Sequence, residues 1–180
     1  MVAYETDFMN YNILIVNEFL ANSTLLEMWI AGQDQALSKR GLPWQHCMSL
    51  PAYTLDSVKR PSITNARATT DANPTIHNRW RLAYTALFYD PLALRPFFDN
   101  IWTTMDQPGN YYNSTKPNIE LDAAITTLST GPVWIADKIG LTNRTVTMKT
   151  CRADGLLLRP SRAITPIDAM FALPPSQGGV

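Results

Sequence analysis

A guanidinium and a carboxylate stand close together where an apolar segment of the chain ends. Residues 63–74, ITNARATTDANP, begin with strand-forming residues, then present Arg67 and Asp71, and finish in turn-prone residues. One interpretation is a structural ion pair at a loop, and a second is that Asp71 caps a helix that starts near Pro74. The third is an active site, because α/β enzymes keep their chemistry at the ends of strands.

Two further candidate strands end in acids, Asp7 and Asp137, and Asp99 lies inside another. In a barrel of parallel strands these ends converge on one face. Carboxylates gathered there are costly unless they are paired, hydrogen-bonded or used. A retaining glycosidase needs such a pattern, with one carboxylate as nucleophile and a second as proton donor about 5–5.5 Å away.

Strand-like and helix-like segments alternate along the chain. The expected strands cover 2–8, 42–51, 62–68, 97–103 and 132–136, and the expected helices cover 24–40, 52–59, 75–90 and 119–130. Two short β-runs are expected around the turn at 153–155. The alternation predicts parallel pairing, because a parallel connection must cross back over the sheet. The fold class is therefore α/β.

Two of the helices carry specific signals. Thr24 and Glu27 have the spacing of a capping box, and Gly41 suits the end of the same helix. In the helix expected over 75–90, helical spacing predicts one buried face. The residues of that face are Ile76, Trp80, Ala83 and Leu87.

Composition excludes some classes of function. Fifteen basic residues balance fifteen acidic ones, which argues against a nucleic-acid or membrane-surface role driven by bulk charge. No apolar run approaches the roughly 20 residues of a membrane span. Cys47 and Cys151 could pair or stay free, and they lack metal-ligand spacing, so neither a metal nor a cofactor is expected. Three sequons, at Asn22, Asn113 and Asn143, weakly favour a secreted glycoprotein.

An ordered series of motifs over about 110 residues resembles glycoside hydrolase family 36, the α-galactosidase and raffinose-synthase group. The matching segments are RATTD (67–71), PTIHNRWRLAYTALF (74–88), GPVWIADKIG (131–140) and LLLRPSRAITPIDAMF (156–171). They are similar to the family's R-A-S-D-D, H-T-I-H with A-Y-N, P-I-Y-V-S-D-K-P-G and L-R-C…P-T-R-D-C-L-F. The resemblance implies that residues 1–173 form strands four to eight of a (β/α)8 barrel. Residues 174–180 are expected to be a disordered tail.

A closed barrel of this type takes about 250 residues, so strands one to three are expected to lie outside this chain. The resemblance also assigns roles. YETDF (4–8) matches the family's K-x-D motif and makes Asp7 the nucleophile, although Glu5 stands in the place of the Lys. Asp71 becomes the acid/base, although Thr70 replaces the first of the family's two adjacent acids. A fragment of this kind is expected to be inactive alone.

Four further residues are candidates for binding an oligosaccharide or glycoside substrate. Arg67 matches the family's Arg and would orient a sugar hydroxyl or a carboxylate, and Asp137 matches an acid that lines the sugar site. Asp99 and Trp44 complete the set, with Trp102 and Trp134 as other indoles that could stack on a sugar.

Plain structural interpretations stand beside these roles. Asp7 could belong to a solvated terminus, Asp137 could be part of an exposed turn with Lys138, and tryptophans near strands usually pack in a core. Two other functional hypotheses remain open. One is a non-catalytic relative that binds glycans, which the changes at Glu5 and Thr70 favour. The other is an unrelated α/β protein.

Overall fold

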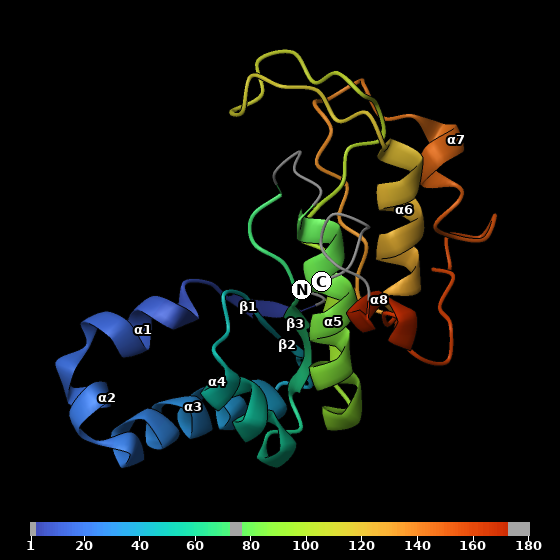
Figure 1. Cartoon of the computed structure of the whole chain (residues 1–180). Helices are drawn as coiled ribbons and strands as arrows, with labels where there is room; N and C mark the ends of the chain where they lie inside the picture. Colours follow the sequence, from blue (N-terminus) through green and yellow to red (C-terminus); the bar gives the residue numbers. More distant parts are fainter. Residues whose placement is uncertain (1–2, 73–76, 173–180) are drawn as a thin grey trace. The chain divides into compact units, whose positions relative to one another are not determined.

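The computed structural model of the chain describes residues 3–72 and 77–172 (Figure 1). Two compact units divide it. The first comprises Met1–Arg67 and Pro91–Arg95, and the second comprises Ala68–Asp90 and Pro96–Val180. The expected tail at 174–180 and the helix start expected near Pro74 lie outside the described residues.

A four-stranded parallel sheet alternates with helices, which confirms the α/β class. The strand order is β1-β2-β3-β4. The strands are β1 (Tyr4–Thr6), β2 (Trp44–His46), β3 (Ile63–Arg67) and β4 (Arg95–Phe97). The order follows the sequence because each strand is joined to the next by a segment that contains helix.

Helices of very different length lie between and after the strands (Figure 1). Before β3 lie α1 (Met9–Ile15), α2 (Asn17–Ala21), α3 (Ser23–Ser38), α4 (Pro51–Asp56) and the 3₁₀ turn η1 (Ser57–Lys59). After β3 lie α5 (His77–Tyr89), the 3₁₀ turn η2 (Asp90–Leu92), α6 (Ile119–Leu128), α7 (Arg144–Thr147) and α8 (Asp168–Ala172). The helices expected over 24–40, 52–59, 75–90 and 119–130 are thus present, whereas α1, α2, α7 and α8 were not expected.

The start of α3 differs from the expected capping box. Asn22 is the N-cap, and its side-chain oxygen accepts a hydrogen bond from the Thr24 backbone N–H at 3.0 Å. The prediction that Thr24 caps the helix is therefore wrong, because the helix begins at Ser23 and Thr24 already lies inside its first turn. The end agrees with the prediction. Gly41 has φ +62°, and Leu42 N–H donates to the Leu37 carbonyl at 3.1 Å, as expected where a glycine ends a helix.

An aromatic cluster forms the core of the first unit. Trp44, His46 and Tyr53 are fully buried, and the rings of Trp44 and His46 meet edge-to-face with centroids 4.5 Å apart. His46 also lies edge-to-face with Tyr53, with centroids 6.5 Å apart. The buried Asp34 on α3 accepts a hydrogen bond from the Ser62 backbone N–H at 3.1 Å, which ties α3 to the start of β3.

In the second unit, the buried face of α5 is rotated slightly about the helix axis from the expected face. Leu82, Ala83, Ala86 and Tyr89 are buried, whereas Leu87 is 44% exposed. Leu87 was expected inside, so this part of the prediction is wrong, and Ile76 lies outside the described residues. An ion pair between Arg79 on α5 and Asp122 on α6, 2.7 Å long and almost fully buried, joins the two helices.

Several expected strands are shorter than predicted. The segment 132–136 forms a single parallel bridge, Ile101↔Ile135, and the strand expected over 97–103 is reduced to β4 and that bridge. The two C-terminal β-runs reduce to one antiparallel bridge, Cys151↔Leu157, around the turn at Gly155. Gly131 is required where the chain passes β4, because an added Cβ would collide with the Pro96 carbonyl oxygen and lie 2.6 Å from the Phe97 Cβ.

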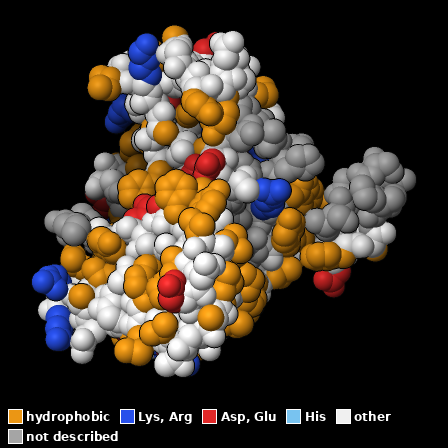
Figure 2. Space-filling view, turned by 90° about the vertical axis from the view of Figure 1, so that its left-hand side faces the viewer, with side chains coloured by type: hydrophobic (Ala, Val, Ile, Leu, Met, Phe, Trp, Pro, Cys, Tyr) orange, Lys and Arg blue, Asp and Glu red, His pale blue; other side chains and the backbone are white. Residues whose placement is uncertain are grey.

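Hydrophobic side chains are numerous on the face shown in Figure 2, where charged side chains are sparse. In the first unit the large apolar side chains that are more than half exposed include those of α1, α2 and α3: Leu14, Ile15, Leu20 and Met28. None of the described helices is long and apolar enough to span a bilayer.

Candidate functional site

The first three strands carry polar residues on one face of the sheet. Glu5 is in register with Gln45, and Gln45 is in register with Asn65. The Gln45 amide donates to the Glu5 carboxylate at 2.9 Å. Parallel strands are usually apolar on both faces, because helices cover both sides of the sheet. A row of carboxylate and amide side chains departs from this apolar pattern and therefore indicates a functional surface.

At the carboxyl ends of the same strands lie Asp7, Cys47 and Arg67. Asp7 directly follows β1, Cys47 directly follows β2, and Arg67 is the last residue of β3. Asp7, Cys47 and Arg67 each come two positions after Glu5, Gln45 or Asn65. Because side chains alternate along a strand, they lie on the same face of the sheet as that polar row. Two of the predicted site residues, Asp7 and Arg67, are thus brought to one end of the sheet in the first unit.

A hydrogen bond orients the Asp7 carboxylate: the Phe8 backbone N–H donates to one of its oxygens at 2.7 Å. The Cys47 thiol lies near this carboxylate. Burial, followed by the neighbouring Asp7 carboxylate, raises the pKa of the Cys47 thiol, and the nearby Arg67 guanidinium only partly opposes the rise. Cys47 therefore stays protonated at neutral pH.

Trp44 lies on the opposite face of β2 from Gln45. Its side chain is fully buried, and its indole N–H donates to the Thr6 hydroxyl at 2.9 Å. The ring packs against His46 in the core of the first unit. This environment favours a packing role for Trp44 over a sugar-stacking one.

In the second unit, the loops that follow β3 and β4 are tied together. Ala68 N–H donates to the Phe97 carbonyl at 3.0 Å, and Asp99 N–H donates to the Thr69 hydroxyl at 3.2 Å. The Asp99 carboxylate accepts a hydrogen bond from Ala72 N–H at 2.6 Å. Asp71, which is exposed, lies in this joined pair of loops, so two further predicted residues share one neighbourhood.

Several hydrogen bonds hold the Asp137 carboxylate in place within the second unit. Its carboxylate accepts hydrogen bonds from the Thr103 backbone N–H at 2.8 Å, from the Thr103 hydroxyl, and from the Gln107 amide at 2.9 Å. The Lys138 backbone N–H in turn donates to the Gln107 side-chain oxygen at 2.6 Å. Asp137 therefore connects its own segment to Thr103 and Gln107, rather than forming part of a solvated turn.

Asp137 also lines a hollow of about 410 Å³ together with Trp102 and Asn110. Beside Trp102 lies Lys116, whose ammonium nitrogen is 4.7 Å from the centroid of the indole ring. Lys116 is 2% exposed, and this nitrogen has no hydrogen-bond partner among the described residues. Burial lowers the pKa of Lys116, an effect opposed first by Asp122 and then by Asp99 and Asp137. Nothing in the sequence pattern distinguished this lysine from a solvated one.

No family model, curated protein or solved structure matches the chain. Within residues 3–72 and 77–172, no group of three or more His, Cys, Asp or Glu side chains could hold a metal ion. Both cysteines are free thiols, which answers the question left open by the sequence. The candidate residues thus form two sets: Asp7, Cys47 and Arg67 in the first unit, and Asp71, Asp99 and Asp137 in the second.

Proposed function

We propose that the chain is the carboxyl-terminal part of the catalytic barrel of a retaining glycosidase that acts on an α-linked, galactoside-type sugar. One observation carries the proposal: each candidate acid lies just beyond the carboxyl end of a parallel strand or bridge. Asp7 follows β1 directly, Asp71 comes four residues after β3, Asp99 two residues after β4, and Asp137 two residues after the bridge at Ile135. Barrel enzymes place their catalytic groups at these ends.

The sheet supports the finer fold as well. Four parallel strands in sequential order, followed by the parallel bridge Ile101↔Ile135, match the five consecutive strand positions expected for strands four to eight of a (β/α)8 barrel. The polar row formed by Glu5, Gln45 and Asn65 suits the inner face of such a barrel near its mouth. The remaining three strands would be supplied by chain outside this sequence.

In this proposal the reaction is a double displacement. The Asp7 carboxylate attacks the anomeric carbon while the Asp71 carboxyl group donates its proton to the departing glycosidic oxygen, so the aglycone leaves as an alcohol. Asp71, now ionised, removes a proton from a water molecule. That water attacks the glycosyl–Asp7 ester, releases the sugar and regenerates both groups. The Phe8 N–H orients Asp7 for the attack.

A fluorinated mechanism-based α-galactosyl fluoride tests the assignment in the complete protein that contains this chain. We expect one covalent label on the peptide that carries Asp7, found by mass spectrometry of a digest. Asp7→Asn should remove the label, and the matched change Glu18→Gln on α2, at the surface, should leave it in place. Turnover of an α-galactoside without any label at Asp7 would disprove the assignment.

A second candidate is a non-catalytic glycan-binding barrel. It is favoured by Thr70, which replaces an acid of the family motif and accepts a hydrogen bond from the Arg81 guanidinium at 3.2 Å. This contact gives Thr70 a structural task. The two candidates differ in turnover by the unaltered protein, which only an enzyme shows and which Asp7→Asn or Asp71→Asn should remove. A binding protein shows no turnover and retains its affinity for the sugar after either change.

A further inference from the structure

We propose that the loop formed by residues 105–116 of the second unit binds a neutral sugar unit of the substrate. The identity of this ligand as a sugar rests on the proposed function. The site itself rests on the two hollows that adjoin the loop and on the groups that line them, none of which belongs to the proposed reacting pair, Asp7 and Asp71.

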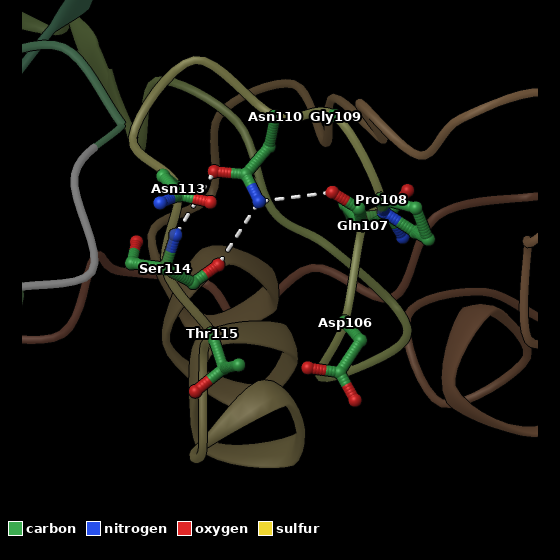
Figure 3. Close-up of a pocket in the computed structure, with 8 residues that line it drawn as sticks. All are labelled: Asp106, Gln107, Pro108, Gly109, Asn110, Asn113, Ser114 and Thr115. Atoms are coloured by element: carbon green, nitrogen blue, oxygen red, sulfur yellow. Dashed lines mark hydrogen bonds between the residues drawn. The ribbon is translucent and has the colours of Figure 1, made fainter.

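The loop is closed and internally braced. Lys116 N–H donates to the Met105 carbonyl at 2.9 Å and closes the loop at its base. Asn110 bridges its two arms: the side-chain amide donates to the carbonyl oxygens of Gln107 at 2.9 Å and Ser114 at 3.0 Å, and the side-chain oxygen accepts from Ser114 N–H at 3.3 Å. Figure 3 shows Asn110 between the arms, with Asp106 and Thr115 on opposite arms. A braced loop loses little conformational entropy when it binds a ligand.

Two hollows adjoin this loop and share Gln107, Pro108, Gly109 and Asn110. The smaller, of about 210 Å³, lies between the arms of the loop. The larger, of about 410 Å³, reaches Trp102, Asp137 and Lys138. The two hollows therefore adjoin the same four residues, and the larger one also carries Asp137, a candidate substrate-binding residue.

The lining favours a neutral polyhydroxy ligand. In the smaller hollow, five of the eight lining residues carry a side-chain amide or hydroxyl group, and the Ser114 hydroxyl is buried without a hydrogen-bond partner among the described residues. The Asp106 and Asp137 carboxylates would repel an anion. A cation would meet Lys138, whose ammonium group already donates to the Pro108 carbonyl at 3.3 Å.

An exposed aromatic ring stands on the loop between Asn110 and Asn113. Tyr111 is 94% exposed, and its ring meets that of Tyr112 edge-to-face with centroids 5.3 Å apart. An uncovered tyrosine presents a rigid amphipathic surface at a low entropy cost, which suits the apolar face of a sugar ring. Tyr111 itself lines neither hollow, so it would stack on a sugar that extends beyond them, while the hollows supply directional hydrogen-bonding groups.

The test uses the complete protein carrying Asp7→Asn, so that binding is measured without turnover. Titration with the disaccharide α-galactosyl-1,6-glucose, followed by ¹⁵N-correlated NMR, should shift the amide signals of residues 105–116. Tyr111→Ala should weaken the affinity about three- to tenfold. The matched change Tyr84→Ala, on a partly exposed tyrosine of α5, should leave it unchanged. Glucuronate should bind more weakly than glucose.

Two results would overturn the inference. One is disaccharide binding that leaves residues 105–116 unshifted and is indifferent to Tyr111→Ala. The other is tighter binding of glucuronate than of glucose. Failure of the proposed function would give a different result. If the loop binds the disaccharide but Asp7 is never labelled, the sugar site stands and the enzyme assignment is wrong.

Discussion

The Asp99 carboxylate accepts a hydrogen bond from the Ala72 backbone N–H at 2.6 Å. This contact joins the loop that follows β3 to the loop that follows β4, and both loops carry predicted site residues. A second contact runs in the opposite direction, from Asp99 N–H to the Thr69 hydroxyl at 3.2 Å. The position of Asp71, one residue before Ala72, therefore depends on Asp99. In the proposed enzyme, Asp99 would position the acid/base residue.

Replacing Asp99 with alanine should loosen this pair of loops. A hydrogen bond to a charged group contributes about 1.5–3 kcal/mol, so we expect the free energy of unfolding to fall by about 2 kcal/mol. Hydrogen exchange at the Ala72 amide should accelerate at the same time. The matched change Asp154→Ala removes an acid whose ion pair with Arg152 is solvent-exposed, and it should cost less than about 0.5 kcal/mol. Equal losses from the two changes would show that Asp99 does not hold the loop.

The two cysteines should differ sharply in reactivity. Cys47 is 3% exposed, and burial together with the neighbouring Asp7 carboxylate raises the pKa of its thiol, whereas Cys151 is partly exposed. Alkylation needs the thiolate and access to it. Iodoacetamide at pH 8 should therefore modify Cys151 first, and Cys47 only after unfolding. The variant Cys151→Ser should remain unmodified when native and take up one label in urea. Rapid labelling of native Cys151→Ser would contradict the burial of Cys47.

His46 should make the first unit sensitive to acid. Desolvation by burial lowers the pKa of His46 from about 6.5 to about 4, partly opposed by the Asp56 carboxylate. Between these values the unfolded chain binds a proton that the folded chain does not, so stability falls as the pH drops from 6.5 to 4. The full effect corresponds to about 3 kcal/mol.

Urea titrations followed by tryptophan fluorescence at several pH values would measure the effect of His46. The variant His46→Phe keeps an aromatic ring between Trp44 and Tyr53 and removes the titrating group. We expect a smaller loss of stability between pH 6.5 and 4 in this variant than in the unaltered chain. Identical pH dependence in the two chains would assign the acid sensitivity to other groups.

Sequence patterns located most of the regular elements because those elements depend on local signals. Gly41 ended α3 as predicted, and the apolar residues of β3 marked a strand. The errors occurred where tertiary contacts, rather than local signals, determine burial or strand formation. Leu87 has the spacing of a buried residue but lies 44% exposed, and the strand expected over 132–136 is only a bridge at Ile135. Such outcomes depend on which other elements pack against each face of a helix or strand, and a single sequence does not contain that information.

The candidate site divides in the same way. The positions of Asp7 and Asp71 near strand ends were predictable, because the strands before them are recognisable in the sequence, whereas Asp99 was expected inside a strand and instead follows β4. The proximity of Cys47 to Asp7 was not predictable, because it depends on the register between two strands about 40 residues apart. Lys116 was also missed, because its burial beside Trp102 follows from the path of a turn-rich loop that has no periodic pattern.

Gly131 is predicted to be the glycine least tolerant of a side chain among those described. An added Cβ would meet the Pro96 carbonyl oxygen and would lie 2.6 Å from the Phe97 Cβ, and a strand's backbone cannot move aside cheaply. We expect Gly131→Ala to lower the free energy of unfolding by about 1–3 kcal/mol. Gly32, inside α3, has open space around it, so Gly32→Ala should instead raise stability by about 0.5–1 kcal/mol. Thermal and urea unfolding of the two variants would measure both changes. A neutral Gly131→Ala would mean that residues 131–137 do not pass as close to β4 as the fold requires.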